Sequence, residues 1–556
     1  SRCLECGCPD VFECKLRKYA TDYEVDPSRL AGEHIDKFEE ANEYYVRNMD
    51  KCILCGRCVR ACDEIAGFHA IDFARRGFES VMVPQFFKPI ESSDCTFCGM
   101  CTQVCPVGAL LEKRAIRWPH SEEPEVVKTT CNKCPLGCEL DLNLERSRHR
   151  ITRVTTDLDN PASPTHGHCC VKGRYEFNDV WEDRLLAPTI KGEEVSWSEA
   201  LDTLAGIMKE ADPAKTAFLS SASLTNEEYR ALGSFLKGSG VEPSFAATDI
   251  DSFAPGLGVL KGELGVSRGT ASYDAVHNSD CFLLVGTNTD EEQPVFSSWI
   301  RRAMRKNGAS LVYVGEDAGM LEKGKSWVFP AKKGSEKEIL KGLQAAILTK
   351  ENMDIPDELA SYVPDRVTGS TGVSRELYLE AAQALLSSKR LVTLIGAEIA
   401  SSPSATENVC TLMETLEKKD LFILYREANT QGLINTGIVN TTLLDTIGKV
   451  RSGEVRNLIL LDVAPSKVGL KDVLPELENV IYIGSTRLPE EEMKAVVAVP
   501  KTCWAEQAGT FININNTEVS LNPGPVTAGT SRNLTWILSG TARRLAFHMD
   551  PNTLSY

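Results

Sequence analysis

Eight cysteines near the start of this chain are spaced like metal ligands. The run C-x2-C-x2-C-x3-C occurs at Cys52–Cys62 and again at Cys95–Cys105. Three thiolates on one tight loop can bind three irons of a [4Fe–4S] cubane, and a more distant thiolate binds the fourth. When two such runs occur together, the last cysteine of each serves the other cubane. We therefore predict a first set of ligands, Cys52, Cys55, Cys58 and Cys105, and a second set, Cys95, Cys98, Cys101 and Cys62.

Two other kinds of site use clustered cysteines. A pair of zinc sites would need four thiolates each at looser spacing, and a disulfide framework belongs to small secreted proteins. Pro106 follows Cys105, as the bacterial iron–sulfur pattern requires, whereas Asp63 follows Cys62 and leaves the ligands intact. The spacing favours iron–sulfur clusters.

A third group continues the pattern with C-x2-C-x3-C, at Cys131, Cys134 and Cys138. Its fourth ligand must come from downstream, and the candidate thiols are those of Cys169 and Cys170. Two imidazoles flank this pair and could replace a thiol, those of His166 and His168. All-thiolate ligation is usual for [4Fe–4S] clusters, so we expect both histidines to be loop residues beside the site.

A fourth group opens the chain with C-x2-C-x-C-x5-C, at Cys3, Cys6, Cys8 and Cys14. Four thiolates in so short a stretch can close one site alone, and the spacing favours a [4Fe–4S] cluster over zinc without fitting either pattern well. Four groups of four cysteines would bind a chain of four clusters, and electrons could pass from each cluster to the next.

Composition narrows the class of protein. The 556 residues carry a net charge of −17, which argues against a nucleic-acid partner. No stretch of 18 apolar residues predicts a membrane span, and no signal peptide precedes the cysteines. Only Cys281, Cys410 and Cys503 lie beyond residue 170, too sparse for a disulfide scaffold. We expect a reducing, cytoplasmic location.

The elements that must position these ligands change character along the chain. Residues 27–48 read as a connector with a helix, on the spacing of Ile35, Phe38, Ala41 and Tyr45. From residue 185 onward, short apolar runs alternate with helices, and predict parallel strands in α/β architecture with two interleaved subdomains. The predicted strands are Cys281–Val285, Leu311–Val314, Leu391–Ile395, Leu421–Tyr425, Leu458–Leu461 and Val480–Ile483. Capping boxes are predicted at Ser196/Glu199 and Thr225/Glu228.

One nucleotide-binding pattern occurs in an unsuitable context. Gly319, Gly324, Lys325 and Ser326 match G-x4-G-K-[ST], which binds phosphate only when a helix begins directly after it. Here Trp327–Pro330 predicts a strand instead. No motif in the chain supports a flavin or NAD site.

Residues 49–180 resemble the N-terminal part of NAD-linked formate dehydrogenase catalytic subunits and the large iron–sulfur subunit of complex I. The matching segments are CILCGRCVRACDE, CTFCGMCTQVCPVGALLEK, CNKCPLGC and CCVKGRYEFNDVWEDRLLAP, and the likeness continues through SSASLTNEEY, LLVGTNTDEEQPV, REANTQGLINTG and WAEQAGTFININN. The resemblance implies an α+β two-cluster ferredoxin domain followed by α/β molybdopterin-oxidoreductase-like domains. It also implies that Cys170 is the fourth ligand of a third set, Cys131, Cys134, Cys138 and Cys170. Lys172 would stand where the family relays electrons between cluster and pterin.

The chain departs from that family at its molybdenum site. The family places a Cys or selenocysteine beside a His near residues 245–256, and Phe245–Gly256 contains neither. The family also ends in a domain of roughly 100 residues or more over the pterin dinucleotides, whereas about 45 residues follow Phe511 here. We expect molybdopterin and its C-terminal domain to be absent.

The first residues, SRCLECGCPDVFECKLRKYA, resemble the stretch after a flavin domain of the glutamate synthase small-subunit type, which handles NADPH through FAD. FAD and NADP(H) would then lie in an upstream module outside this chain. Together these features resemble the large subunit of electron-bifurcating transhydrogenases of the Sporomusa type.

The predicted divisions are residues 1–26, 27–48, 49–115, 116–185 and 186–556. The expected function is an iron–sulfur electron-transfer subunit of a cytoplasmic NAD(P)(H)/ferredoxin oxidoreductase, without a substrate-converting site of its own. Expected partners are diaphorase-type flavin/iron–sulfur subunits, ferredoxin and the NADPH-flavin module. The alternatives are a catalytic NAD(P)-dependent formate dehydrogenase subunit with molybdopterin, and a scaffold role for residues 185–556.

Overall fold

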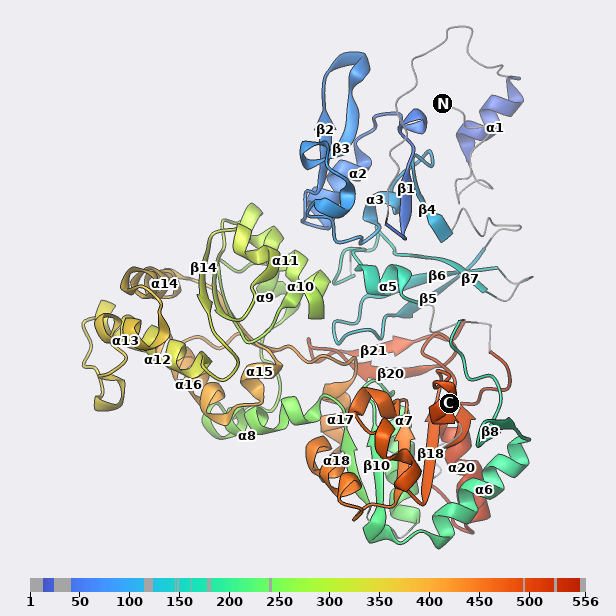
Figure 1. The fold of residues 1–556 in the computed structure, drawn as a ribbon. Coiled ribbons are helices and arrows are strands. Elements are labelled where there is room, and N and C mark those ends of the chain that lie inside the picture. Colours follow the sequence, from blue (N-terminus) through green and yellow to red (C-terminus); the bar gives the residue numbers. More distant parts are fainter. Residues whose placement is uncertain are drawn as a thin grey trace. The chain divides into compact units, whose positions relative to one another are not determined.

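The fold falls into two compact units, shown in Figure 1. The first comprises residues 1–131, 138–177 and 524–526, and the second residues 132–137, 178–523 and 527–556. The computed structural model describes residues 14–24, 42–114, 124–145, 147, 150–161, 163–177, 182–239, 243–493, 496–524 and 528–550. Among these residues no helix is long and apolar enough to cross a bilayer. Three thiols of the fourth set and most of the predicted 27–48 connector lie outside the described ranges.

Two matching turns organise the first unit. Helix α2 (Arg57–Arg60) follows Gly56, and helix α3 (Met100–Gln103) follows Gly99. Both glycines are left-handed, with φ of 73° and 70°. Two residues earlier, Leu54 and Phe97 also have positive φ, 55° and 54°. The repeated sequence thus forms a repeated backbone, because each short loop must curl its cysteines around one point and glycine permits the tightest step.

Short antiparallel strands complete the first unit. They pair as β1 (Tyr45–Arg47) with β4 (Leu110–Glu112), β2 (Ile71–Ala74) with β3 (Val81–Pro84), and a sheet of β5 (Glu125–Thr130), β6 (Glu139–Glu145) and β7 (Arg150–Thr155). The unit also contains helices α1 (Lys15–Asp22) and α5 (Val171–Tyr175). The prediction that Tyr45 is helical was wrong. Its backbone pairs with Glu112, and its N–H donates to the Asn42 side chain, so tertiary pairing outweighs the local period.

The second unit contains two largely parallel sheets, as predicted. The seven-stranded sheet has the order β11-β10-β17-β18-β19-β8-β9, and the five-stranded sheet β14-β13-β12-β15-β16. The chain builds β8, β9, β10 and β11 of the first sheet, then the whole second sheet, and then returns to the first, so the subdomains are interleaved. A small hairpin of β20 (Gly509–Ile512) and β21 (Glu518–Leu521) follows. Strand bounds are β8 Thr189–Ile190, β9 Glu193–Glu194, β10 Thr216–Ser220, β11 Ser244–Ala247, β12 Cys281–Val285, β13 Ser310–Gly315, β14 Ser326–Pro330, β15 Leu391–Ile395, β16 Leu421–Ile423, β17 Asn457–Leu461, β18 Asn479–Gly484 and β19 Val497–Pro500.

Both faces of the seven-stranded sheet are buried. Alternate residues of one strand enter two separate hydrophobic clusters: Phe218 belongs to one, and Ala217 and Leu219 to the other. Side chains alternate across a strand, so a strand covered on both sides must be apolar throughout. This explains the continuous apolar runs in the sequence. Helices α6 (Trp197–Glu210), α7 (Asn226–Gly238) and α20 (Leu534–Arg544) pack against one face (Figure 1).

The remaining helices connect the strands of the second unit. Thr225 and Glu228 form the predicted capping box at the start of α7, and the Ser196 side chain accepts from the Glu199 N–H at the start of α6. The helices are α8 Ala254–Glu263, α9 Tyr273–His277, α10 Thr289–Glu292, α11 Pro294–Lys306, α12 Glu336–Lys350, α13 Pro364–Thr371, α14 Arg375–Ser387, α15 Ala397–Ala400, α16 Pro403–Thr415, α17 Thr430–Thr436, α18 Leu443–Arg451 and α19 Glu490–Met493. Strand β14, not a helix, follows Lys325, which confirms that the phosphate-loop pattern lacks its required context.

The close approach of β12 and β15 at their carboxyl ends gives a test of the packing. A Cβ at Gly396 would lie 2.3 Å from both the Gly286 carbonyl oxygen and the Thr287 Cβ. Gly396→Ala should lower the free energy of unfolding by about 1–3 kcal/mol, because backbone must move to admit the methyl group. Gly258→Ala, inside α8 with open space around it, is the control and should stabilise the protein by about 0.5–1 kcal/mol. Equal denaturant midpoints for the two variants would contradict this.

Candidate functional site

The structure brings the four thiols of the predicted first set to one cavity. Cys52, Cys55, Cys58 and Cys105 line it together, with Met49, Phe73 and Met82 among its apolar walls. Burial raises the pKa of Cys58 to about 12, and the charges of Cys105 and Cys52 add to the shift. Cys105 comes from the second sequence run, so the exchange of the last cysteine between runs is present in the folded chain.

The second set gathers in the same crossed way. Burial and the neighbouring Cys95 raise the pKa of Cys62 to about 11. Burial and Cys62 raise the pKa of Cys98 to about 12. Burial, Cys95, Cys98 and Cys62 hold the pKa of Cys101 well above its ordinary value. Each set therefore combines three thiols of one run with one thiol of the other.

These surroundings fit iron–sulfur ligation. Backbone N–H groups point at sulfur, from Leu54 to Cys52 at 3.4 Å and from Phe97 to Cys95 at 3.4 Å. Near neutral pH, clustered thiols with raised pKa values stay protonated unless they bind a metal centre. Coordination to the metal removes the thiol proton. In the described part of the chain, no three His, Cys, Asp or Glu side chains are grouped so as to hold a single metal ion.

Part of the predicted third set lies around the start of α5. The Cys131 N–H donates to the Cys138 carbonyl oxygen at 2.8 Å. Burial raises the pKa of Cys170, while the backbone N–H groups of Gly173 and Lys172 donate to its sulfur and oppose that shift. Burial also raises the pKa of Cys169, to about 11. The charge of Arg174 and a hydrogen bond from its side chain likewise oppose the rise at Cys169, so the choice of Cys170 as fourth ligand stays a prediction from the resemblance.

The remaining predicted residues divide between the units. Cys134 lies in the loop 132–137, which packs within the second unit: the Ile514 N–H donates to the Pro135 carbonyl, and the Tyr273 hydroxyl to the Leu136 carbonyl. Lys172 lies on α5, and its charge favours the thiolate of Cys170. In the fourth set, Cys14 directly precedes α1, whereas Cys3, Cys6 and Cys8 lie outside the described residues. The full fourth site stays a prediction.

A buried arginine joins the second set to the α5 region, and sequence reasoning did not single it out. Arg174 is fully buried and donates to the Cys98 carbonyl oxygen at 2.9 Å and the Val154 carbonyl oxygen at 2.9 Å. Gly99 makes room for it, since a Cβ there would lie 2.3 Å from Arg174 Cδ. The sequence shows that Arg174 lies four residues after Cys170, but it does not show that this arginine contacts the second cysteine run.

The second unit has two places where α/β sheets normally form a ligand crevice, beyond the carboxyl ends of strands at which the strand order reverses. These points lie between β10 and β17 and between β12 and β15. At the second point Gly396 touches the backbone of Gly286, and Ile399 covers Gly286. Arg426 Nε donates to Glu292 at 3.0 Å, and Thr287 Oγ1 to the same carboxylate at 2.8 Å. The two strand ends are therefore closely packed here, and the Glu292 carboxylate is held by side chains of the same unit.

Carboxylates also occupy the first reversal point. Glu427 accepts from Ser221 at 2.6 Å and Ser223 at 3.1 Å. The buried Lys501 ammonium lies 2.9 Å from Asp462 and 3.1 Å from Glu228. The Lys501 ammonium thus lies between two carboxylates, and Glu427 is held by two hydroxyls.

Asp249 stands within the segment where the family resemblance places a molybdenum ligand. Its Oδ2 accepts from the backbone N–H groups of Arg426 (2.9 Å) and Glu427 (3.0 Å) and from Thr430 Oγ1 (2.6 Å). Its Oδ1 is buried without a hydrogen-bond partner. Burial raises the pKa of Asp249 to about 6, against the hydrogen bond from Thr430, with Glu427 adding to the rise. Sequence reasoning missed this residue, because it considered only Cys and His in the segment.

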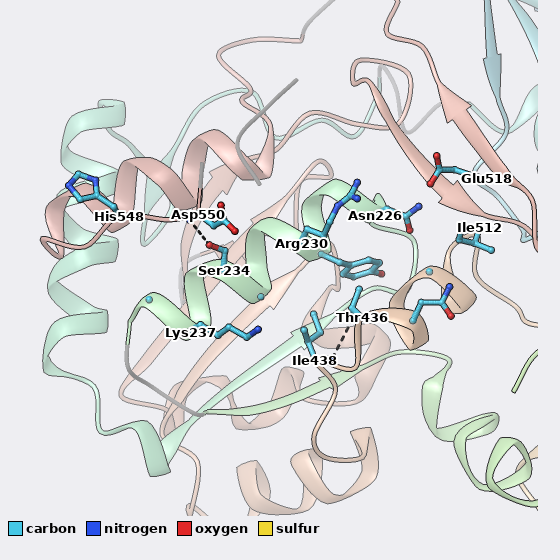
Figure 2. Close-up of a pocket in the computed structure, with 15 residues that line it drawn as sticks. Asn226, Arg230, Ser234, Lys237, Thr436, Ile438, Ile512, Glu518, His548 and Asp550 are labelled. Atoms are coloured by element: carbon cyan, nitrogen blue, oxygen red, sulfur yellow. Dashed lines mark hydrogen bonds between the residues drawn. The ribbon is translucent and has the colours of Figure 1, made fainter. Parts of the chain in front are cut away.

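A separate cleft of about 730 Å³ runs along α7 (Figure 2). Asn226, Arg230 and Lys237 lie on one wall, with Thr436 opposite. Its charges are mixed, because Glu518 and Asp550 also line it and Arg230 pairs with Glu227 at 2.8 Å. No cysteine of the described residues lines this cleft.

Comparison with known proteins agrees with the fold. The chain is 26% identical to an NADPH-Fe(3+) oxidoreductase subunit alpha of Geobacter sulfurreducens, over 89% of this chain and 64% of that protein. It is 26% identical to an NADH-quinone oxidoreductase subunit of Rhizobium meliloti, over 78% of this chain and 52% of that protein. The chain thus spans less than two thirds of the length of these relatives. Acetylene hydratase from Pelobacter acetylenicus shares the fold, with a TM-score of 0.60 at 14% identity over 76% of this chain and 69% of that chain.

Family matches cover both parts of the sequence. Residues 39–109 match a 4Fe-4S dicluster domain, and residues 124–179 the Fe4S4 domain of molybdopterin oxidoreductases. Residues 184–543 match the molybdopterin oxidoreductase family itself. The predicted ferredoxin-like region followed by an α/β domain is confirmed. Because this last match spans more than half of the chain, the chain belongs to the molybdopterin oxidoreductase family.

Proposed function

We propose that this chain is the iron–sulfur electron-transfer subunit of a cytoplasmic NAD(P)(H)/ferredoxin oxidoreductase, of the electron-bifurcating transhydrogenase kind, and converts no substrate itself. Its partners would be diaphorase-type flavin/iron–sulfur subunits, ferredoxin and a module carrying FAD and NADP(H). The family supplies the redox class, and relatives named as oxidoreductase subunits support the subunit role. The observation that carries the proposal is the crossed gathering of eight thiols into two sets.

The residues of the first unit are suited to hold a row of redox centres. A [4Fe–4S] cluster, when bound, takes up and releases one electron at a time. The first and second sets would hold one cluster each, and backbone N–H groups directed at Cys52 and Cys95 would stabilise the thiolate charge. Arg174 and Gly99 keep the second set close to α5, where Cys170 and Lys172 lie. The third and fourth sets, as predicted from the sequence, would extend the row.

The second unit supports a role without molybdopterin. The groups around both strand-order reversals are joined to each other, and the side chains there include Glu292, Glu427 and Asp462. A pterin dinucleotide would bring two phosphates against these carboxylates and displace paired side chains. The residues present therefore do not fit that cofactor, and we propose that this unit serves as a scaffold.

Metal content separates this proposal from a formate dehydrogenase. Four sets of four thiolates should yield about 16 irons per chain after anaerobic reconstitution. Metal analysis should find molybdenum and tungsten well below one per chain. Either metal at one per chain, retained through gel filtration, would contradict the proposal.

Removing one ligand should remove one centre. In Cys58→Ala the first set loses a thiolate, so the spin count of the dithionite-reduced protein should fall by about one cluster and iron by up to about four per chain. The matched control is Cys410→Ala, a buried thiol of α16, which should leave both values unchanged. An unchanged spin count in Cys58→Ala would show that the first set is assigned wrongly.

The buried carboxyl of Asp249 should make stability depend on pH. Its folded pKa, about 6, exceeds the ordinary value of 3.8, so the folded chain holds the proton more tightly and loses stability as pH rises through this window. Asp249→Asn keeps an oxygen for the three donors and removes this penalty. It should stabilise the protein at pH 8 by up to about 3 kcal/mol, and by less at pH 5.

Thermal melts at the two pH values measure the difference. Asp251→Asn is the control, because that carboxylate lies two residues away and accepts a single backbone hydrogen bond from Leu444. A gain for Asp249→Asn that is the same at pH 5 and pH 8 would contradict the burial argument.

A further inference from the structure

The two halves of the cluster-binding repeat differ in what covers them. Phe97 and Leu54 occupy equivalent positions, each with positive φ between two cysteines of its run. Phe97 is packed against aromatic rings, with centroids 5.3 Å from Tyr44 and 6.3 Å from Tyr45. Leu54 has no such cover and is 42% exposed. The repeat is therefore closed beside the second set and open beside the first.

On the open side Ile53, Leu54 and Phe73 are 49%, 42% and 43% exposed. Phe86 (83% exposed) and Phe87 (51%) follow β3, which pairs with the strand of Phe73. These five residues are here called the first-cluster face. Three of them, Ile53, Leu54 and Phe73, also line the cavity of the first set, and the Cys55 residue is itself exposed. Soluble proteins rarely expose several large apolar side chains in one patch unless a partner or ligand binds to that patch.

The loop that follows β3 displays its two rings under strain. Phe86 and Phe87 have φ of 57° and 55°, which is rare for bulky residues. Neither ring is buried. Strained residues persist where function uses them. The loop contacts Arg75, the residue that follows β2, whose guanidinium lies 5.6 Å from the Phe87 ring centroid.

Two cations lie near the exposed rings of this face, those of Arg75 and Lys88. The Lys88 ammonium lies 5.9 Å from the Phe86 ring centroid, and the exposed cations of residues 53–88 are Arg57, Arg60, Arg75, Arg76 and Lys88. The same stretch has four acidic residues, of which Asp63 and Asp72 lie 3.2 and 3.4 Å from the His69 ring nitrogens. This stretch thus has one more cation than it has carboxylates, whereas the chain as a whole has a net charge of −17. An acidic protein would be repelled less here than by the rest of the chain, and Arg75, Arg76 and Lys88 offer partners for its carboxylates.

We infer that the first-cluster face docks an acidic one-electron carrier protein, and that the row of centres exchanges electrons with this partner at its first-set end. The inference rests on the proposed function and adds the surface and the chemistry of the partner. A reduced carrier would lose one electron and the centre held by the first set would gain it, with no bond made or broken. A second copy of this chain fits poorly, since a two-fold contact would set the same cations against each other.

Binding and electron transfer can be measured with a small acidic ferredoxin as the probe, using the full reconstituted chain under anaerobic conditions. In Phe86→Ser/Phe87→Ser and in Arg75→Glu/Arg76→Glu, the Kd from calorimetric titration should rise about tenfold or more, because anchors and charges at a contact centre dominate binding. Affinity of the native chain should fall as salt increases. The matched control is Leu444→Ser, which removes a side chain 75% exposed on α18 of the other unit.

A second measurement separates a failure of the docking surface from a failure of the proposed electron-transfer function. Stopped-flow reduction of the oxidised chain by methyl viologen radical should proceed equally in all variants, whereas reduction by the reduced ferredoxin should slow about tenfold in the face variants. Unchanged ferredoxin binding and rate in both face variants would overturn the docking surface while leaving the proposed function intact. Self-association of the native chain that these variants abolish would also overturn it, in favour of a second copy. Failure of the native chain to accept electrons from either donor would overturn the proposed function.

Discussion

The first unit depends on one constraint: each cluster site must draw thiols from two distant stretches of chain. Cys105 joins the run at Cys52, and Cys62 joins the run at Cys95. Neither run can complete its site alone, so the strands between them are held in place by the ligands at both ends. Clustered thiols repel one another once ionised, and the cation that they share turns this repulsion into attraction.

In the second unit, the buried charged groups are carboxylates that are held by hydrogen bonds and ion pairs within the chain. At the strand-order reversals, carboxylates from one segment accept hydrogen bonds from another: Asp249 joins β11 to the chain after β16, and Glu427 joins that chain to the end of β10. Lys501 links Asp462 with Glu228 in the same way. The carboxylates at these places are therefore held by amide, hydroxyl and ammonium groups of the same unit.

The two cysteine runs have similar backbones but differ in which side chains cover them. Both halves share glycine and positive-φ positions, but Tyr44 and Tyr45 shield Phe97 while Leu54 stays open. On the closed side Arg174 leads from Cys98 toward α5. The exposed Phe86 and Phe87 follow β3, which pairs with the strand that carries Phe73 of the open half. Both rings are adjacent in the sequence, yet only the structure shows that they are left uncovered.

The sequence by itself determined what spacing and period encode. The cysteine runs predict two ligand sets, each with one cysteine from the other run. The apolar runs predict six strands that the two sheets contain. Trp327–Pro330 predicts the strand that argues against a phosphate-binding loop. These features are local, and local geometry follows from residue type and separation. Tertiary structure alone decided that Tyr45 is a strand residue, that Arg174 reaches Cys98, and that Asp249 is buried against the chain after β16. Each of these depends on partners far away in the chain, whose approach is set by packing and by the need to satisfy buried polar groups.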